Sequence, residues 1–151
     1  MYFAIAAQSV VLSLSKRHGA VFNWLRRIFT ALIVRSVGAR VKLTGIIDAD
    51  TDILIVNHQS MFDIFTLEEV VGNDIRFIGR TGIMDKWPVS RIVDRVGHIT
   101  VDLKDRRAII KLLKDVKVCK GKKVVIFPEG TRSQSGKIEA FELGAKLLVE
   151  K

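Results

Sequence analysis

The sequence predicts an α/β fold, with a mixed central sheet, flanking helices and a pair of helices at the N-terminus. Two observations support this prediction. From about residue 40 onward, apolar runs of strand length alternate with longer segments of helical periodicity. Before residue 38, two longer apolar stretches have helical length instead. A chain of 151 residues has the size of one domain, and we divide it into a helical region over 1–38 and an α/β domain over 39–151.

The first apolar stretch runs from Met1 to Leu14 and is followed by the polar, basic segment Ser15 to Gly19. A full bilayer span needs about 20 apolar residues, so this stretch is short. It lacks the basic leader and small-residue cleavage site of a signal peptide. We expect a membrane-inserted anchor or a truncated span. The alternative is a buried helix of a soluble fold.

The second stretch, Val21 to Val37, has amphipathic spacing. Its apolar face would carry Val21, Trp24, Leu25, Ile28, Phe29 and Leu32, and its polar face Asn23, Arg26, Arg27 and Thr30. An aromatic-rich apolar face opposite arginines is typical of a helix lying in a membrane interface. The alternative is that the same apolar face packs in the protein core.

Basic residues flank or interrupt the two apolar stretches: Lys16, Arg17, Arg26, Arg27, Arg35 and Arg40. A bias of this kind marks the cytoplasmic side of a membrane. We therefore expect residues 1–38 to form a membrane-associated helical pair on the inner, cytoplasmic face.

The α/β domain follows from the order of its apolar runs. The expected strands are Arg40–Thr44 at an edge, Ile53–Val56 in the centre, Ile75–Gly79, Ile99–Val101 and Lys122–Phe127. The expected helices are Met61–Val71, Met84–Val96 with an interruption at Pro88, Asp105–Val118 and Phe141–Glu150.

His58 stands at a strand-to-helix turn, directly after the run Ile53–Val56. Ligands of open α/β sheets bind beyond the carboxyl ends of the strands, so this histidine would be exposed to a substrate. Ser60 and Asp63 have the spacing of a capping box that opens the next helix. Asp63 can then reach back to one imidazole nitrogen and make the other a general base. The alternative is a capping aspartate beside an ordinary loop histidine.

A second polar loop follows the run Val124–Phe127 and contains Pro128-Glu129-Gly130-Thr131-Arg132-Ser133. Gly130 permits close backbone approach, Thr131 offers a hydroxyl, and Arg132 offers a planar guanidinium suited to phosphate. The pattern indicates an anion-binding loop. The alternative is a surface turn with an internal ion pair between Glu129 and Arg132.

Composition narrows the class of partner. Lysine and arginine outnumber aspartate and glutamate by 25 to 16, a net charge of +9, which favours phosphorylated substrates or an anionic membrane surface. Nucleic acid is not expected, because no nucleic-acid-binding motif or aromatic stacking platform is present. Cys119 is the single cysteine, so no internal disulfide can form, and we expect a core or edge position for it and not a nucleophilic role. The three histidines lack partners at metal-ligand spacing, and no metal is expected.

Together, the stretches Asn57-His-Gln-Ser-Met-Phe-Asp63 and Phe127-Pro-Glu-Gly-Thr-Arg-Ser133 resemble the first and third sequence blocks of the glycerolipid acyltransferases. The resemblance is strongest to the lysophosphatidic acid acyltransferases, and it spans roughly Val41 to Lys151. It implies that His58 is the general base and Asp63 its orienting partner. It also implies that Glu129, Gly130, Thr131 and Arg132 bind the acceptor phosphate.

The chain departs from the family pattern at two places. Gly97 to Asp102 occupies the position of the second block, but Leu103 stands where the family carries a substrate-binding arginine. Arg106 or Arg107 would have to replace it, and Arg80 lies where the family often carries a basic residue. The fourth block has no counterpart before Lys151, so we expect the C-terminal part of the fold to be missing.

The resemblance implies transfer of a fatty acyl group from an acyl thioester to the free hydroxyl of lysophosphatidate, giving phosphatidate in phospholipid biosynthesis. The donor would be a thioester of acyl-carrier protein or coenzyme A, used as a co-substrate, and no bound cofactor is implied. Two alternatives remain: an acyltransferase that acts on glycerol 3-phosphate or another lysolipid, and a catalytically silent membrane-binding fragment.

Overall fold

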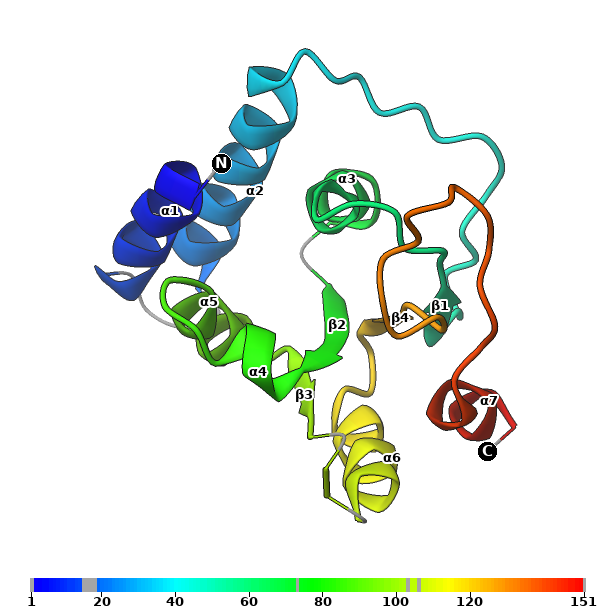
Figure 1. The fold of residues 1–151 in the computed structure, drawn as a ribbon. Helices are drawn as coiled ribbons and strands as arrows, with labels where there is room; N and C mark the ends of the chain where they lie inside the picture. The colour runs from blue at the N-terminus through cyan, green and yellow to red at the C-terminus, as the bar shows by residue number, and fades with distance from the viewer. Residues whose placement is uncertain (1, 15–18, 73, 103, 106, 151) are drawn as a thin grey trace.

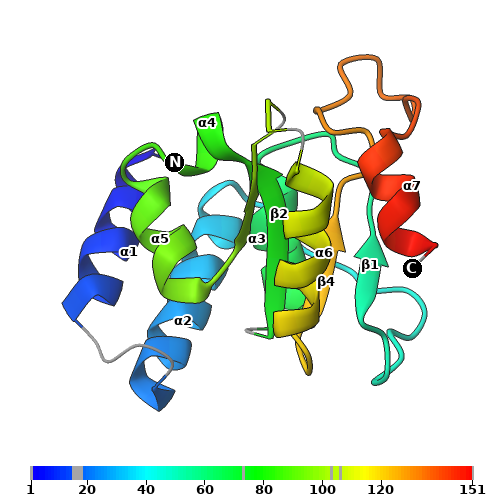
Figure 2. The same ribbon diagram turned by 90° about the horizontal axis from the view of Figure 1, so that it is seen from below.

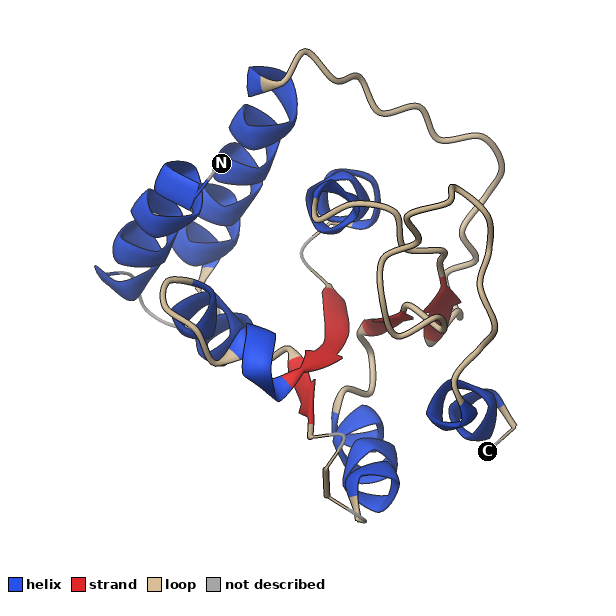
Figure 3. Cartoon of the chain, in the orientation of Figure 1, coloured by secondary structure: helices blue, strands red, loops and turns tan. Residues whose placement is uncertain are grey.

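The computed structural model describes residues 2–14, 19–72, 74–102, 104–105 and 107–150. Within these residues the helices are α1 (Tyr2–Leu14), α2 (Ala20–Ser36), α3 (Phe62–Val71), α4 (Thr81–Met84), α5 (Val89–Val96), α6 (Ala108–Val118) and α7 (Leu143–Val149). The strands are β1 (Ile53–Ile55), β2 (Ile75–Arg80), β3 (Ile99–Val101) and β4 (Lys123–Ile126). Figures 1 and 3 show this arrangement.

The four strands form one sheet in the order β1-β4-β2-β3, and every pairing is parallel. The α/β prediction is confirmed, but the prediction of a mixed sheet is wrong for the described strands. Successive strands are connected through helices, which return the chain to the same end of the sheet and so favour parallel pairing. Two strand-helix-strand units are of this kind: β1-α3-β2 and β3-α6-β4.

Helices cover both faces of the sheet (Figure 2). On one face, α3 and α5 pack over a core centred on Ile75, Phe77 and Val125. On the other, α6 and α7 pack over Val124 and Ile126. Because side chains alternate along a strand, neighbouring residues of β4 serve opposite cores. Because helices cover both faces of this parallel sheet, the loops at the carboxyl ends of its strands are the part left open to a ligand.

The helical pair α1 and α2 forms a further layer outside α3 and α5 (Figure 1). Ile5 of α1 and Ile33 of α2 contact Phe65 of α3, while Leu12 and Phe22 pack on α5. None of the helices in the described ranges combines the length and the apolar character needed to span a bilayer.

The buried side of α2 carries polar residues, not the apolar face that core packing of this helix would bury. Arg26 is 1% exposed, whereas Trp24 is 62% exposed. The reason lies on α3, where the buried carboxylate of Glu68 pairs with Arg26 and accepts a hydrogen bond from Thr30 Oγ1 at 2.8 Å. A buried carboxylate requires charged and polar partners, so it draws the polar face inward. The alternative that the apolar face packs in the protein core is therefore wrong for four of its residues, which are exposed: Val21, Trp24, Ile28 and Leu32.

Two strand predictions are also corrected. Arg40–Thr44 is not an edge strand, since residues 39–52 form an extended, irregular connection between α2 and β1 (Figure 3). All five side chains of the segment are exposed, so its alternation of apolar and basic residues buries no face. Ile53–Ile55 is a strand, but β1 stands at the end of the strand order and not in its centre. Ile55 is accordingly 50% exposed.

The remaining elements agree with their predictions to within a few residues. α3, β2, β3, α6, β4 and α7 lie where expected. The stretch 84–96 is interrupted at Pro88 as predicted, with α4 beginning earlier, at Thr81, and α5 starting at Val89. α3 ends at Gly72, which has a φ of 90° that glycine adopts without steric cost.

Candidate active site

The two polar loops singled out in the sequence lie side by side because their strands are neighbours. β1 leads into the loop of His58, and its partner β4 leads into the loop of Glu129. The pairing continues past β1, with Val56 N donating to Ile126 O at 3.1 Å. Ser133 N then donates to His58 O at 2.7 Å. Strands of parallel pairing thus bring residues about seventy positions apart to one edge of the sheet.

His58 and Asp63 form the predicted pair. His58 Nδ1 lies 2.9 Å from Asp63 Oδ2, which also accepts hydrogen bonds from Gln59 N at 2.8 Å and Ser60 N at 2.9 Å. Asp63 is in the first turn of α3, where the helix dipole favours a carboxylate. An ionised carboxylate at Nδ1 fixes the proton there and leaves Nε2 as the basic nitrogen. The pair can therefore take a proton from a hydroxyl placed at Nε2.

The capping box predicted at this turn forms in part. The carboxylate of Asp63 accepts from Ser60 N, as the pattern requires. The Ser60 hydroxyl, however, accepts a hydrogen bond from Phe62 N at 3.1 Å and not from the amide of Asp63. The Asp63 carboxylate therefore both caps the helix and holds His58, so the alternative of a cap alone is wrong.

Phe127 holds the other side of the histidine. The rings of His58 and Phe127 are stacked, with centroids 4.0 Å apart and an interplanar angle of 19°. Phe127 is stacked in turn on Phe77 of β2, with centroids at 6.2 Å. A ring fixed between a carboxylate at its edge and an aromatic face has little freedom to rotate. No sequence pattern indicated this role for Phe127, and the usable signal was an aromatic residue at the end of an apolar run, directly before the Pro128 to Ser133 loop.

Glu129 braces the two loops against each other. Its side chain is 5% exposed, and its two oxygens accept hydrogen bonds from His58 N at 2.9 Å and Glu139 N at 3.0 Å. These backbone hydrogen bonds, first from Glu139 and then from His58, lower the pKa of Glu129 and keep it ionised. An ion pair with Arg132 is absent among the described residues, so the alternative of a self-contained surface turn is wrong.

Gly130 has a φ of 66°, which favours glycine, and a side chain at this position would be tightly packed. A Cβ at this position would lie 3.0 Å from Glu142 Cγ and 3.4 Å from Arg80 Nη2. The guanidinium of Arg80, at the end of β2, therefore reaches the loop that follows β4. In the sequence, Arg80 was a candidate only because of its position in the family pattern, whereas the structure places its guanidinium against the loop that follows β4.

Arg80 and Arg132 are both available to an anion. Thr131 and Arg132 are exposed on the loop. Neither Arg80 nor Arg132 has an ion pair or hydrogen bond to any residue that the structure describes. Two guanidinium groups at one edge of the sheet suit a phosphate, which accepts bidentate hydrogen bonds. Arg106, the predicted replacement for the arginine missing after Asp102, lies outside the described residues.

His98 and Cys119 do not belong to this site. His98 Nδ1 accepts a hydrogen bond from Phe77 N at 3.2 Å, and burial, aided by the charges of Arg26 and Arg76, holds the pKa of His98 well below its usual value. Burial likewise raises the pKa of the Cys119 thiol, which makes it a poor nucleophile. Both are structural residues.

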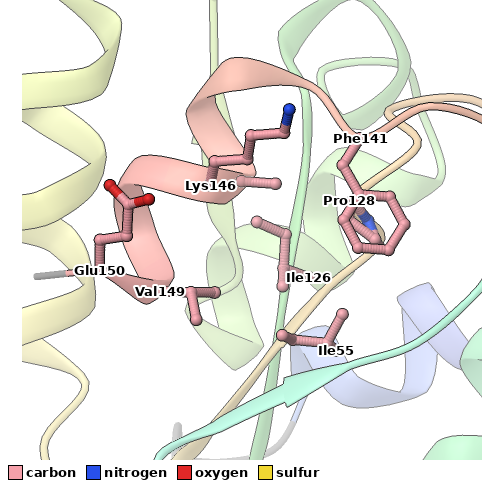
Figure 4. Close-up of a pocket in the computed structure, with 8 residues that line it drawn as sticks. Ile55, Ile126, Pro128, Phe141, Lys146, Val149 and Glu150 are labelled. Atoms are coloured by element: carbon pink, nitrogen blue, oxygen red, sulfur yellow. The ribbon is translucent and has the colours of Figure 1, made fainter.

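An apolar groove of about 210 Å³ lies between α7 and the edge of the sheet. Figure 4 shows Ile55, Ile126 and Val149 converging on it, with Phe141 and Pro128 at one end. Ile126 points to the α7 face of the sheet, while its neighbour Phe127 points to the α3 face and carries the ring of His58. The groove and the histidine are therefore on opposite sides of β4.

The acyltransferase family model matches residues 40–151, which include both loops and every strand of the sheet. The chain belongs to the acyltransferase family. The matched range begins after α2, so the helical pair lies outside it.

Several relatives carry the name of one enzyme. The chain is 32% identical over 117 residues to a 1-acyl-sn-glycerol-3-phosphate acyltransferase of Helicobacter pylori, covering 76% of this chain and 49% of that protein. It is 35% identical over 112 residues to a chloroplastic 1-acyl-sn-glycerol-3-phosphate acyltransferase of Brassica napus, covering 72% of this chain and 32% of that protein. A lyso-ornithine lipid O-acyltransferase of Rhizobium meliloti is 28% identical over 120 residues, covering 77% of this chain and 40% of that protein. The chain thus spans half or less of the length of these relatives.

The fold is also that of a solved acyltransferase structure. The crystal structure of the 1-acyl-sn-glycerophosphate acyltransferase PlsC from Thermotoga maritima matches 95% of this chain and 60% of its own, with a TM-score of 0.70 and 22% identity. The likeness extends over nearly the whole chain, including helices that the family model leaves out.

Proposed function

We propose that the chain carries the catalytic centre of an enzyme that transfers a fatty acyl group from a thioester to the free hydroxyl of 1-acylglycerol 3-phosphate, giving phosphatidate. One observation carries this proposal. The His58–Asp63 pair is joined through Glu129 to a loop at which two unpaired arginines, Arg80 and Arg132, can hold a phosphate. The names of the relatives support the same acceptor.

The reaction needs one proton transfer in each direction. The acceptor hydroxyl gives its proton to His58 Nε2 as its oxygen attacks the thioester carbonyl carbon. When the tetrahedral intermediate collapses, the C–S bond breaks and the thiolate takes the proton from the imidazolium. Asp63 stabilises the imidazolium between these steps, because its carboxylate stays at Nδ1. The acyl group passes directly to the acceptor, and the donor, acyl-carrier protein or acyl-coenzyme A, is a co-substrate.

Glu129 acts in this scheme as a brace and not as a phosphate ligand. Both of its oxygens are occupied by backbone amides, and a second anion close to its carboxylate would be repelled. Arg80, Thr131 and Arg132 bind the phosphate, while Gly130 lets the loop backbone approach it. The brace keeps the acceptor phosphate at a fixed distance from His58.

We also propose that α2 lies on the cytoplasmic face of a membrane. Its outer surface exposes Val21, Trp24 and Leu32 at 63%, 62% and 56%. Apolar residues gathered on one exposed helix face favour an interface with lipid, and exposed arginines beside them add roughly 1 kcal/mol each on anionic lipid. Arg27 and Arg35 are exposed on this helix. The acceptor and product are lipids, so a site beside the membrane avoids moving acyl chains through water.

Substitution of the general base tests the reaction. His58→Ala should lower kcat with lysophosphatidate and an acyl thioester by about 10²- to 10⁴-fold. Gln59→Ala is the matched control, because Gln59 is in the same loop and its side chain makes one weak hydrogen bond within the described residues, to Gly136 O at 3.4 Å. Near-normal turnover in a folded His58→Ala protein would contradict the mechanism. A wild-type protein inactive with every lysolipid would instead favour the catalytically silent fragment.

A panel of acceptors tests the second candidate function. The Rhizobium meliloti relative is named for a different lysolipid, which favours comparing lysophosphatidate with other lysolipids and with glycerol 3-phosphate. The proposal expects the highest kcat/KM with lysophosphatidate. A higher value with another acceptor would reassign the substrate and leave the mechanism intact.

Vesicle flotation tests the membrane proposal. The double variant Trp24→Ser/Leu32→Ser should bind vesicles that contain anionic phosphatidylglycerol roughly tenfold or more weakly, because two large apolar side chains no longer enter the lipid. Val118→Ser is the control, since Val118 is 85% exposed but lies on α6, on the far side of the sheet. Equal binding by both variants and the wild type would refute this assignment of α2.

A further inference from the structure

Helix α6 presents an exposed basic face that the proposed reaction does not use. The face consists of Arg107, Lys111, Lys114 and Lys117, with the exposed apolar side chains Ile110 and Val118 among them. At 100° per residue these six positions share one side of the helix, and Leu112, Leu113 and Val116 on the other side pack on the sheet. We call the exposed side the basic face of α6.

The positive charges of this face are not neutralised within the described part of the chain. No ion pair joins Arg107, Lys111, Lys114 or Lys117 to any carboxylate there, and Asp115 is the only acidic residue of the helix. Four unpaired cations along one helix create a positive field that attracts an acidic partner. The partner would also meet Ile110, which is 57% exposed, and Val118, which is 85% exposed.

The position of α6 suits delivery of a substrate. The helix starts after the carboxyl end of β3, at the same edge of the sheet as the loops of His58 and Glu129. Figure 2 shows α6 on the face of the sheet opposite α3. The exposed apolar surface of α2 lies beyond α3, so a membrane bound there leaves the basic face of α6 turned toward water.

From these observations we propose that the basic face of α6 is the docking surface for an acidic carrier protein that brings the acyl thioester. This inference rests on the proposed acyl transfer and names the class of its donor. Beyond the N-cap residue Arg107, the face extends over the eleven residues of α6, about 16 Å, and is a convex helix surface with apolar side chains among its charges. A surface of this kind fits another protein better than the single nucleotide of coenzyme A, which binds in a concave pocket.

Direct binding tests the proposal independently of catalysis. The wild-type chain and the variant Lys111→Glu/Lys114→Glu are titrated with acyl-carrier protein loaded with a palmitoyl thioester at low ionic strength. Two charge reversals should raise the Kd roughly tenfold or more, and the difference should shrink at high salt. The control Lys42→Glu/Lys86→Glu makes the same change in net charge at exposed positions outside α6 and should leave the Kd within about twofold.

Kinetics then separate the possible outcomes. The proposal expects the KM for palmitoyl-carrier protein to rise roughly tenfold in the α6 variant while the KM for palmitoyl-coenzyme A stays within about twofold. An equal rise for both donors would show a general effect on anionic substrates and overturn it. Unchanged binding of the carrier protein by the α6 variant would also overturn the docking proposal. So would a loss of vesicle binding in that variant without a loss of carrier binding, because α6 would then be a membrane contact. A wild-type chain that binds the carrier but transfers no acyl group would refute the proposed function and not the docking surface.

Discussion

Replacing Asp63 with asparagine separates the two tasks that its carboxylate performs. One oxygen, Oδ2, faces His58 Nδ1 and the amides of Gln59 and Ser60, all at 2.8–2.9 Å. An asparagine oxygen can still accept from the two amides, so the helix start remains capped. It cannot carry the charge that holds the proton on Nδ1 and stabilises the imidazolium. The substitution therefore changes the chemistry of His58 more than the fold.

The magnitudes of the two effects differ. Hydrogen bonds to a charged group contribute about 1.5–3 kcal/mol and neutral ones about 0.5–1.5, and the Asp63 side chain is 25% exposed, which weakens the difference. We expect Asp63→Asn to lower the free energy of unfolding by about 1–2 kcal/mol. Loss of the correct tautomer should lower kcat by about 10²- to 10⁴-fold, or about 2.7–5.4 kcal/mol of activation free energy.

Turnover at saturating acceptor and donor, together with urea unfolding, measures both effects. Asp85→Asn is a suitable control, because Asp85 is an exposed carboxylate that follows another helix, α4. A kcat within about threefold of the wild-type value in a folded Asp63→Asn protein would refute the role of Asp63. A large loss of stability with no separate loss of kcat would show that the carboxylate serves only the helix.

Four further substitutions test other parts of the structure. Arg132→Ala should raise the KM for lysophosphatidate by about 10- to 150-fold and leave the KM for the acyl donor unchanged. This is the change expected for the loss of a charge-assisted hydrogen bond of about 1.5–3 kcal/mol. A change in the donor KM alone would assign the loop to donor binding. Arg26→Ala should lower the unfolding free energy by about 3–5 kcal/mol because Glu68 stays buried without its cation, and a second change, Glu68→Leu, should recover most of it in urea titrations. Phe127→Leu should lower kcat by about 2- to 12-fold, the equivalent of the 0.5–1.5 kcal/mol of an aromatic pair, with little change in acceptor KM; equal kcat values would show that the stacking is incidental. The folded protein keeps His98 neutral below the pH at which the unfolded chain protonates it. The free energy of unfolding should therefore fall by up to about 1.4 kcal/mol per pH unit as the pH drops below about 6.5. His98→Gln should remove this part of the pH dependence in unfolding experiments from pH 7 to about 5.

Local spacing, together with the resemblance of the motif to an acyltransferase block, predicted the pairing of His58 with Asp63. His58 and Asp63 are five residues apart across one strand-to-helix turn, and the structure brings the Asp63 carboxylate to the imidazole and to a neighbouring amide. The strands after Asp52 and most helices were likewise predictable, because their apolar periodicity and glycine stops are properties of consecutive residues. The position of the polar loop after β4 also followed from consecutive residues, since Pro128 and Gly130 directly follow an apolar run.

Only the tertiary structure decided which partner each of these elements meets. The pairing of β1 with β4 brings Glu129 to the amide of His58, and the position of β2 brings Arg80 to Gly130. No local pattern contains the strand order, since it depends on contacts between residues far apart in the sequence. For the same reason Arg40–Thr44, whose alternation is typical of a strand, finds no neighbouring strand and stays irregular.

The orientation of α2 shows most clearly that a local pattern does not contain the contacts between distant residues. Its periodicity distinguishes an apolar face from a polar one, but it does not say which of them the protein buries. Glu68 on α3 decides this, because a carboxylate that loses water must gain a cation and a hydroxyl, and Arg26 and Thr30 supply them. The sequence by itself therefore determined that α2 has two unlike faces. The buried charge of Glu68, 42 positions from Arg26, determined that Trp24 faces outward.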